Sequence, residues 1–110
     1  MNRIVNLTPH SINVQLGDGS FQTFESEGNA RASQSFTESG CFKGIRFVHT
    51  KYGAPVGLPE PDGETYYIVS TITVTAAKAA GRTTDDLLTA VDPIRDEQGR
   101  IIGCKALALA

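Results

Sequence analysis

Features that would assign this chain of 110 residues to a familiar class are scarce. It has only two cysteines, Cys41 and Cys104, which are far apart and form no Cys-x-x-Cys pair. We therefore expect no zinc site, and no disulfide in a reduced compartment. Ten basic residues stand against twelve acidic ones and form no run, which disfavours binding to a nucleic acid polymer.

Long apolar runs are also absent. The longest is well short of the ~20 residues that a membrane-spanning helix needs. The first residues lack the apolar core of a signal peptide. We therefore expect a cytoplasmic protein with no membrane partner. The length predicts a single domain over residues 1–110, since domains most often have roughly 100–150 residues.

The common catalytic and phosphate-binding signatures are missing as well. There is no Gly-x-Ser-x-Gly elbow, no Walker loop and no Gly-x-Gly-x-x-Gly turn after a strand. A Cys–His nucleophilic site assembled in space, from Cys104 or Cys41 with His10 or His49, is the catalytic alternative that this leaves. We expect no cofactor and no metal.

What the sequence does contain is a series of short β-prone segments separated by turn residues. They are a strand at 3–7 that ends in a corner at Pro9, a hairpin at 12–24, a weak edge strand at 30–36, a strand at 41–50 with two partly covered faces, and a hairpin at 93–104.

Residues 51–65 hold six Gly and Pro residues and predict a loop. A loop this long in a small domain is often functional, although a purely structural arm remains the alternative. About six or seven strands and one helix predict an α+β fold, with a small curled antiparallel sheet or partial barrel closed by the helix.

The stretch from Tyr66 to Gly81 gives the one physical hint of function. Its first residues are aromatic or β-branched and its later residues are rich in Ala, which predicts a strand leading into a helix at 70–80. Ser70 is then the N-cap, with Gly81 just past the helix end. The free amides of the first helical turn, at the positive end of the helix dipole, favour an anion.

Guanidinium and polar side chains are expected to complete this anion site, because arginine binds phosphate oxygens bidentately. The predicted ligand-binding residues are Asn6, Thr8, His10, Arg46, Ser70, Thr71 and Arg95, with Arg31 as a further candidate. In the alternative interpretation, Ser70 only caps its helix, Thr8 and His10 stabilise a turn, and the arginines pair with surface carboxylates. The aromatic residues Tyr66, Tyr67, Phe42 and Phe47 either stack on a base or, as we expect for most of them, belong to the core.

Three segments carry a resemblance: Ile4–Ile12, Gly57–Pro61 with the Tyr67–Ser70 stretch that follows, and Arg95–Cys104. They resemble a family of small phage, prophage and bacterial proteins that open with Asn-Leu-Thr-Pro-His. The resemblance implies a mobile-element context, and hence a host cytoplasm, rather than a mechanism. It departs at Glu27–Arg31, where similar proteins often have a Pro-Ser-Gly-like turn before Ala-Arg.

The sequence therefore predicts a non-enzymatic protein that binds a small anionic, nucleotide-derived ligand. In a phage context this would be a sponge that sequesters an immune signalling molecule, an analogy of context only. The alternatives are a small Cys/His-dependent hydrolase or transferase, and an interaction protein that blocks a host partner through the Pro-rich loop. A homo-oligomer agrees with these hypotheses, because small domains often cover a sheet edge with a second copy.

Overall fold

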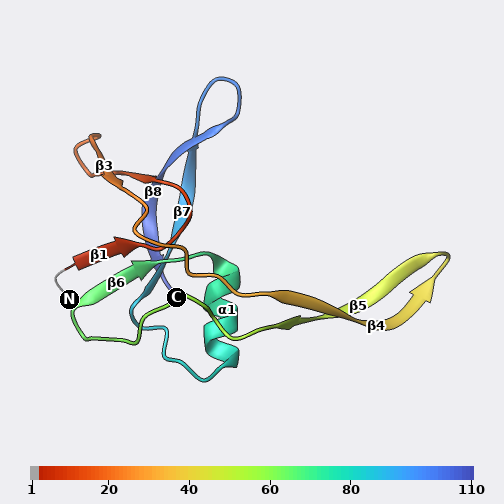
Figure 1. Ribbon diagram of the computed structural model, residues 1–110. Coiled ribbons are helices and arrows are strands. Elements are labelled where there is room, and N and C mark those ends of the chain that lie inside the picture. Colours follow the sequence, from red (N-terminus) through yellow and green to blue (C-terminus); the bar gives the residue numbers. More distant parts are fainter. Residues whose placement is uncertain (1–2) are drawn as a thin grey trace.

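The computed structural model describes residues 3–110, which form eight strands and one helix (Figure 1). In chain order these are β1 (Arg3–Asn6), β2 (Ile12–Gln15), β3 (Phe21–Phe24), β4 (Gln34–Phe42), β5 (Ile45–Tyr52), β6 (Thr65–Ile68), α1 (Thr71–Ala79), β7 (Leu87–Arg95) and β8 (Ile101–Leu109). Six strands form one curled sheet in the order β1-β6-β7-β8-β2-β3, and β4 pairs only with β5. The predicted α+β class with a partial barrel is confirmed.

The curled sheet is mixed, whereas the sequence had predicted antiparallel pairing. β1 and β7 both run parallel to β6, and β2 runs parallel to β8. The two antiparallel pairs, β2–β3 and β7–β8, correspond to the predicted hairpins, and the second is longer than the predicted 93–104 because its strands extend to Leu87 and Leu109. Turn residues between neighbouring strands reveal a hairpin, but parallel pairs join strands that are distant in the sequence, and no local pattern marks them.

Asn6 joins the two edges of the curled sheet. It is the last residue of β1, and it forms a parallel bridge to Ser26, just beyond β3. Its side-chain Nδ2 donates to the carbonyl oxygens of Phe24 at 2.9 Å and His10 at 2.7 Å. Its Oδ1 accepts from the amide and the hydroxyl of Thr8 at 2.9 and 2.7 Å. Asn6 is fully buried, and these contacts bring the sheet close to a closed barrel.

The core lies between α1 and the curled sheet, and small side chains on the helix allow the close approach. Ser70 caps α1 by accepting a hydrogen bond from the amide of Thr73, and Gly81, at φ 82°, follows the C-cap. The predicted strand-to-helix junction and both of its capping residues are thus confirmed. The cluster consists of Leu7, Ala30, Tyr67, Val69, Val74, Ala77 and Leu87, with Val5 and Leu58 packed against it.

The middle of the chain differs most from the sequence-based prediction. In place of the predicted strands at 30–36 and 41–50, β4 runs through Glu38–Gly40, with a bulge between Glu38 and Gly40, and the chain reverses at Lys43–Gly44 into β5. β4 and β5 form a long hairpin, residues 34–52, which we call the arm (Figure 1). Nearly all of its side chains are exposed on both faces, so Phe42 and Phe47 do not belong to the core, whereas Tyr67 does.

Replacing Asn6 with Ala should destabilise the fold by about 2–4 kcal/mol. It removes four hydrogen bonds at a buried position and takes the side-chain donor from the carbonyl oxygen of Phe24, whereas that of His10 keeps the Thr8 hydroxyl. Urea unfolding followed by circular dichroism measures the change. As a control, Asn13→Ala removes more exposed hydrogen bonds to Ile102 and Thr23 and should change the free energy of unfolding by less than ~1 kcal/mol. Equal effects of the two variants would show that the sheet does not depend on Asn6.

Candidate functional site

A small hollow lies beside the start of α1. It has a volume of about 220 Å³, and we call it the Ser70 hollow. Ser70 lies at its edge with its side chain turned to the helix, accepting from Thr73. The amides of Thr71 and Ile72 have no acceptor within residues 3–110. The lining residues are Thr8, Pro9, Asn29, Ala30, Arg31, Ala32, Ser70 and Ile72.

The segment that carries Arg31 is fixed against both the helix and the long loop. The buried hydroxyl of Thr73 donates to the carbonyl oxygen of Ala30 at 3.2 Å. Arg31 and Val56 exchange two backbone hydrogen bonds, of 2.9 and 2.7 Å. Gly57 follows at φ +79°, where a Cβ atom would lie 2.9 Å from a backbone oxygen. The loop thus places Arg31 at the rim of the hollow, where, within residues 3–110, its guanidinium donates only to the carbonyl oxygen of Asn29, at 3.2 Å.

The structure brings together some of the predicted site residues and separates others. Thr8 and Ser70 line the hollow, and Thr71 begins the helix beside it. Asn6 and His10 belong to the turn around Pro9, where the Asn6 side chain uses both its donor and its acceptor within the protein. This arrangement agrees with the alternative interpretation, in which this segment stabilises a turn instead of binding a ligand.

Two of the predicted arginines lie elsewhere, and the expectation that they border the Ser70 junction is wrong. Arg46 lies near the tip of the arm, where it forms an ion pair with Glu38. Arg95 lies at the far end of the β7–β8 hairpin and donates to the carbonyl oxygen of Gly99 at 2.8 Å. Both hairpins project away from α1 (Figure 1). The separation of these arginines from Ser70 along the sequence does not reveal their separation in space. Of the arginine candidates, Arg31 alone lines the hollow.

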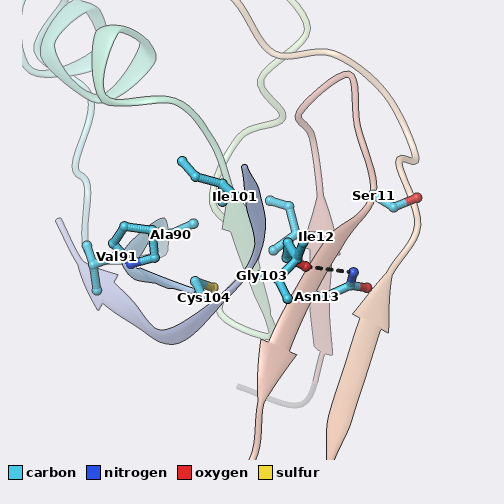
Figure 2. A pocket seen from close by; sticks show the side chains of 10 residues that line it. Ser11, Ile12, Asn13, Ala90, Val91, Ile101, Gly103 and Cys104 are labelled. Atoms are coloured by element: carbon cyan, nitrogen blue, oxygen red, sulfur yellow. Dashed lines mark hydrogen bonds between the residues drawn. The ribbon is translucent and has the colours of Figure 1, made fainter. Parts of the chain in front are cut away.

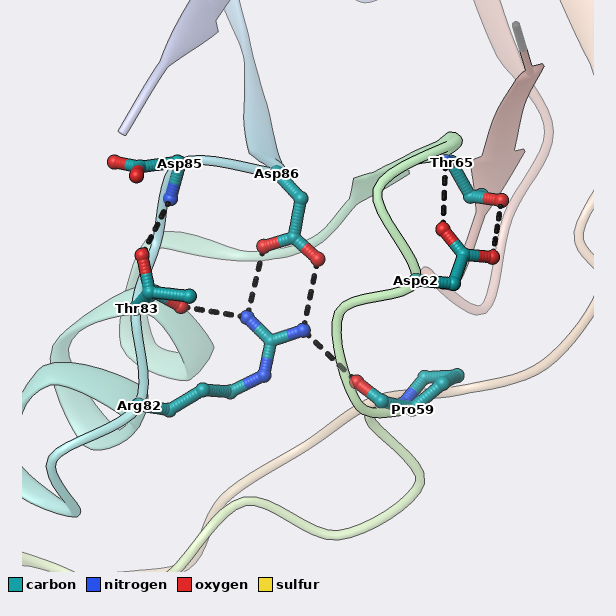
Figure 3. Close-up of polar contacts among 7 residues, drawn as sticks. All are labelled: Pro59, Asp62, Thr65, Arg82, Thr83, Asp85 and Asp86. Atoms are coloured by element: carbon teal, nitrogen blue, oxygen red, sulfur yellow. Dashed lines mark hydrogen bonds and ion pairs between the residues drawn. The ribbon is translucent and has the colours of Figure 1, made fainter. Parts of the chain in front are cut away.

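A buried ion pair, which sequence reasoning missed, lies just after the helix (Figure 3). Arg82 donates to both carboxylate oxygens of Asp86 at 2.9 Å, and also to the carbonyl oxygens of Thr83 and Pro59 at 2.7 and 2.8 Å. The i, i+4 spacing of the pair was its only signal in the sequence. Because this guanidinium is engaged by the protein itself, we assign it to anchoring the long loop to the start of β7.

Asp62 also organises local structure rather than a site. Its carboxylate accepts from the amide of Glu64 and from the amide and hydroxyl of Thr65, at the start of β6 (Figure 3). These hydrogen bonds lower the pKa of Asp62, the Glu64 amide contributing most and the Thr65 hydroxyl next. Since the folded state favours the ionised form, this contribution to stability is present near neutral pH and is lost on acidification through the lowered pKa.

A second hollow, of about 620 Å³, lies between β2 and the β7–β8 hairpin (Figure 2). Its wall is mainly apolar, and at Gly103 the backbone of β8 approaches β2 so closely that a Cβ atom would lie 2.9 Å from the carbonyl oxygen of Asn13. Cys104 is only 4% exposed there, and burial raises the pKa of its thiol. The lining residues are Ser11, Ile12, Asn13, Ala90, Val91, Pro93, Ile101, Ile102, Gly103 and Cys104.

This environment weighs against the Cys/His-dependent alternative, because a nucleophilic cysteine needs a lowered pKa and a nearby base. No histidine of the described chain lines the hollow that contains Cys104. Cys41 and His49 lie on the solvent-exposed arm, where His49 contacts the hydroxyl of Ser39 at 3.1 Å.

Comparison with family models, curated proteins and solved structures finds no match for this chain. Within residues 3–110, no helix has the length and apolar character to cross a membrane. The same residues contain no group of three or more His, Cys, Asp and Glu side chains arranged to hold a metal ion. The candidate site therefore rests on the geometry around Ser70.

Replacing Arg82 with Ala should lower the free energy of unfolding by about 3–5 kcal/mol, because it leaves the carboxylate of Asp86 buried and unpaired. Arg100→Ala is the matched control, since its i, i+4 pair with Asp96 leaves the arginine largely exposed and should contribute less than ~1 kcal/mol. Thermal and urea unfolding measure both. A loss for Arg82→Ala no larger than that for Arg100→Ala would contradict the anchoring role.

The two thiols should react at very different rates with iodoacetamide at pH 8. Cys41 is exposed, whereas Cys104 is buried and has a raised pKa, so at this pH little thiolate forms and the reagent has poor access. Mass spectrometry of the native protein should show Cys41 modified at least tenfold faster, and urea should remove the difference. Faster labelling of Cys104 than of Cys41 in the native state would contradict this prediction and favour the Cys/His-dependent hydrolase or transferase.

Proposed function

We propose that the protein is a non-enzymatic binding protein for a small anionic ligand, with a phosphoryl group of the ligand in the Ser70 hollow. The observation that carries the proposal is the coincidence of the first-turn amides of α1 with a hollow that has Arg31 at its rim. Amide donors at a helix start and a guanidinium are complementary to phosphate oxygens.

The size of the hollow limits what it holds. At about 220 Å³ it is smaller than the ~300–1,000 Å³ of typical drug-sized pockets, so it accommodates a phosphoryl group rather than a whole nucleotide. The remaining part of a nucleotide-derived ligand would extend over Pro9 and the Arg31 side chain, both of which line the hollow. A base has an arginine plane to stack on there.

A binding protein with no catalytic activity agrees with the phage context that the sequence resemblance implies. Sequestering a nucleotide-derived immune signal requires affinity alone, and a phage protein with this role would act in the host cytoplasm as a sponge. The buried, unreactive surroundings of Cys104 support the same choice over the hydrolase or transferase alternative. The long loop supports the site by holding Arg31 in place.

Native mass spectrometry of the purified protein should show a stoichiometric nucleotide-like mass, and calorimetric titration with adenosine diphosphate provides a defined probe. Arg31→Ala should weaken binding at least tenfold, since a charge-assisted hydrogen bond contributes about 1.5–3 kcal/mol. Arg100→Ala, an exposed arginine in the distal hairpin, is the matched control and should leave the affinity unchanged.

Two results would contradict the proposal. One is the absence of both a co-purified mass and any response to adenosine diphosphate or inorganic phosphate. The other is binding that survives Arg31→Ala but is lost in Arg95→Ala or Arg46→Ala. That pattern would place the ligand on one of the two projecting hairpins.

A further inference from the structure

The arm exposes apolar side chains that no other part of residues 3–110 covers. β4 and β5 form a separate two-stranded sheet, and an isolated hairpin of this kind is at best marginally stable in water. Yet Phe42, Ile45 and Phe47 are 57, 61 and 52% exposed. An apolar cluster of this size on a projecting element is typical of an interaction surface.

The strand register divides the arm into two different faces. Phe42 pairs directly with Ile45, and Phe47 is two residues further along β5, so the three side chains share one face. We call it the triad face. The other face carries Phe36 and Val48, interrupted by the ion pair between Glu38 and Arg46. The triad face is the more continuous apolar surface.

The chain exposes more surface than a compact monomer of the same mass does. It is 7173 Å², whereas a compact monomer of 11.7 kDa exposes about 5,900 Å². The radius of gyration, 16.5 Å, likewise exceeds the ~13 Å of a compact chain of this length. Covering the excess in two copies would bury about 2,500 Å² in total, within the ~2,000–5,000 Å² range of obligate homodimers.

We propose that the arm docks on a second copy of this chain, with the two triad faces packed together about a twofold axis. An apolar patch is complementary to itself, which is what a twofold interface requires. Arg46 is paired with Glu38, and Lys43, which lies over the ring of Phe42, and Lys51 give the arm a net charge of +2, a small charge beside the apolar area of the triad face. A net charge of −2 opposes the approach of two copies only weakly. This inference does not depend on the anion site.

Sedimentation velocity of the full chain tests the proposal. The wild-type protein should sediment as a dimer at micromolar concentration. The double variant Phe42→Ser, Phe47→Ser should raise the dissociation constant at least 100-fold and sediment as a monomer. Phe21→Ser, which changes an equally exposed phenylalanine of β3 outside the arm, is the matched control and should remain dimeric. Circular dichroism and thermal unfolding check that each variant is folded.

Cross-linking tests which faces meet, even if the serine variants fold poorly. In a Cys41→Ser background, Ile45→Cys on the triad face should form a disulfide-linked dimer in glutathione buffer at least tenfold faster than Phe36→Cys on the other face. A wild-type monomer at 100 µM, a dimer that persists in the double variant, or equal cross-linking from the two faces would overturn the proposal. So would a monomer that binds a different protein through the arm.

Discussion

The fold depends on the buried side chain of Asn6. From the end of β1, its two polar side-chain atoms bind four groups of the Pro9 turn and the end of β3, and so join strands at opposite edges of the curled sheet. Buried amides of this kind stabilise only when every donor and acceptor is satisfied, as it is here. The same contacts fix the turn that carries Thr8 and Pro9, and this turn forms one wall of the Ser70 hollow.

The polar residues near the helix start therefore divide into two groups by what they contact. Asn6 and the hydroxyls of Thr8 and Thr73 are engaged by protein groups, and they shape the hollow without being available to a ligand. The first-turn amides of α1 and the guanidinium of Arg31 have fewer protein partners and lie where a ligand has access. Under the proposed function, binding and structural roles are thus assigned to different atoms of neighbouring residues.

Local features of the fold were predictable from the sequence, and long-range ones were not. Ser70 and Gly81 mark the ends of α1 through capping chemistry, and the turn residues of the two short hairpins mark their positions. The parallel pairing of β1 with β6 leaves no local trace, and no local pattern indicated that β4 and β5 pair along their whole length as one hairpin. For the site, the junction was predictable, but which arginine lies beside it depends on tertiary packing.

The hollow at the helix start is the central claim, and its amides provide the most direct measurement. In a titration of ¹⁵N-labelled protein with adenosine diphosphate, followed by two-dimensional NMR, the backbone amides of Thr71 and Ile72 should shift most, together with those of Ala30 and Arg31. Saturable shifts confined to this group are the predicted result. Shifts centred on the arm or the β7–β8 hairpin, with Thr71 and Ile72 unmoved, would contradict the account.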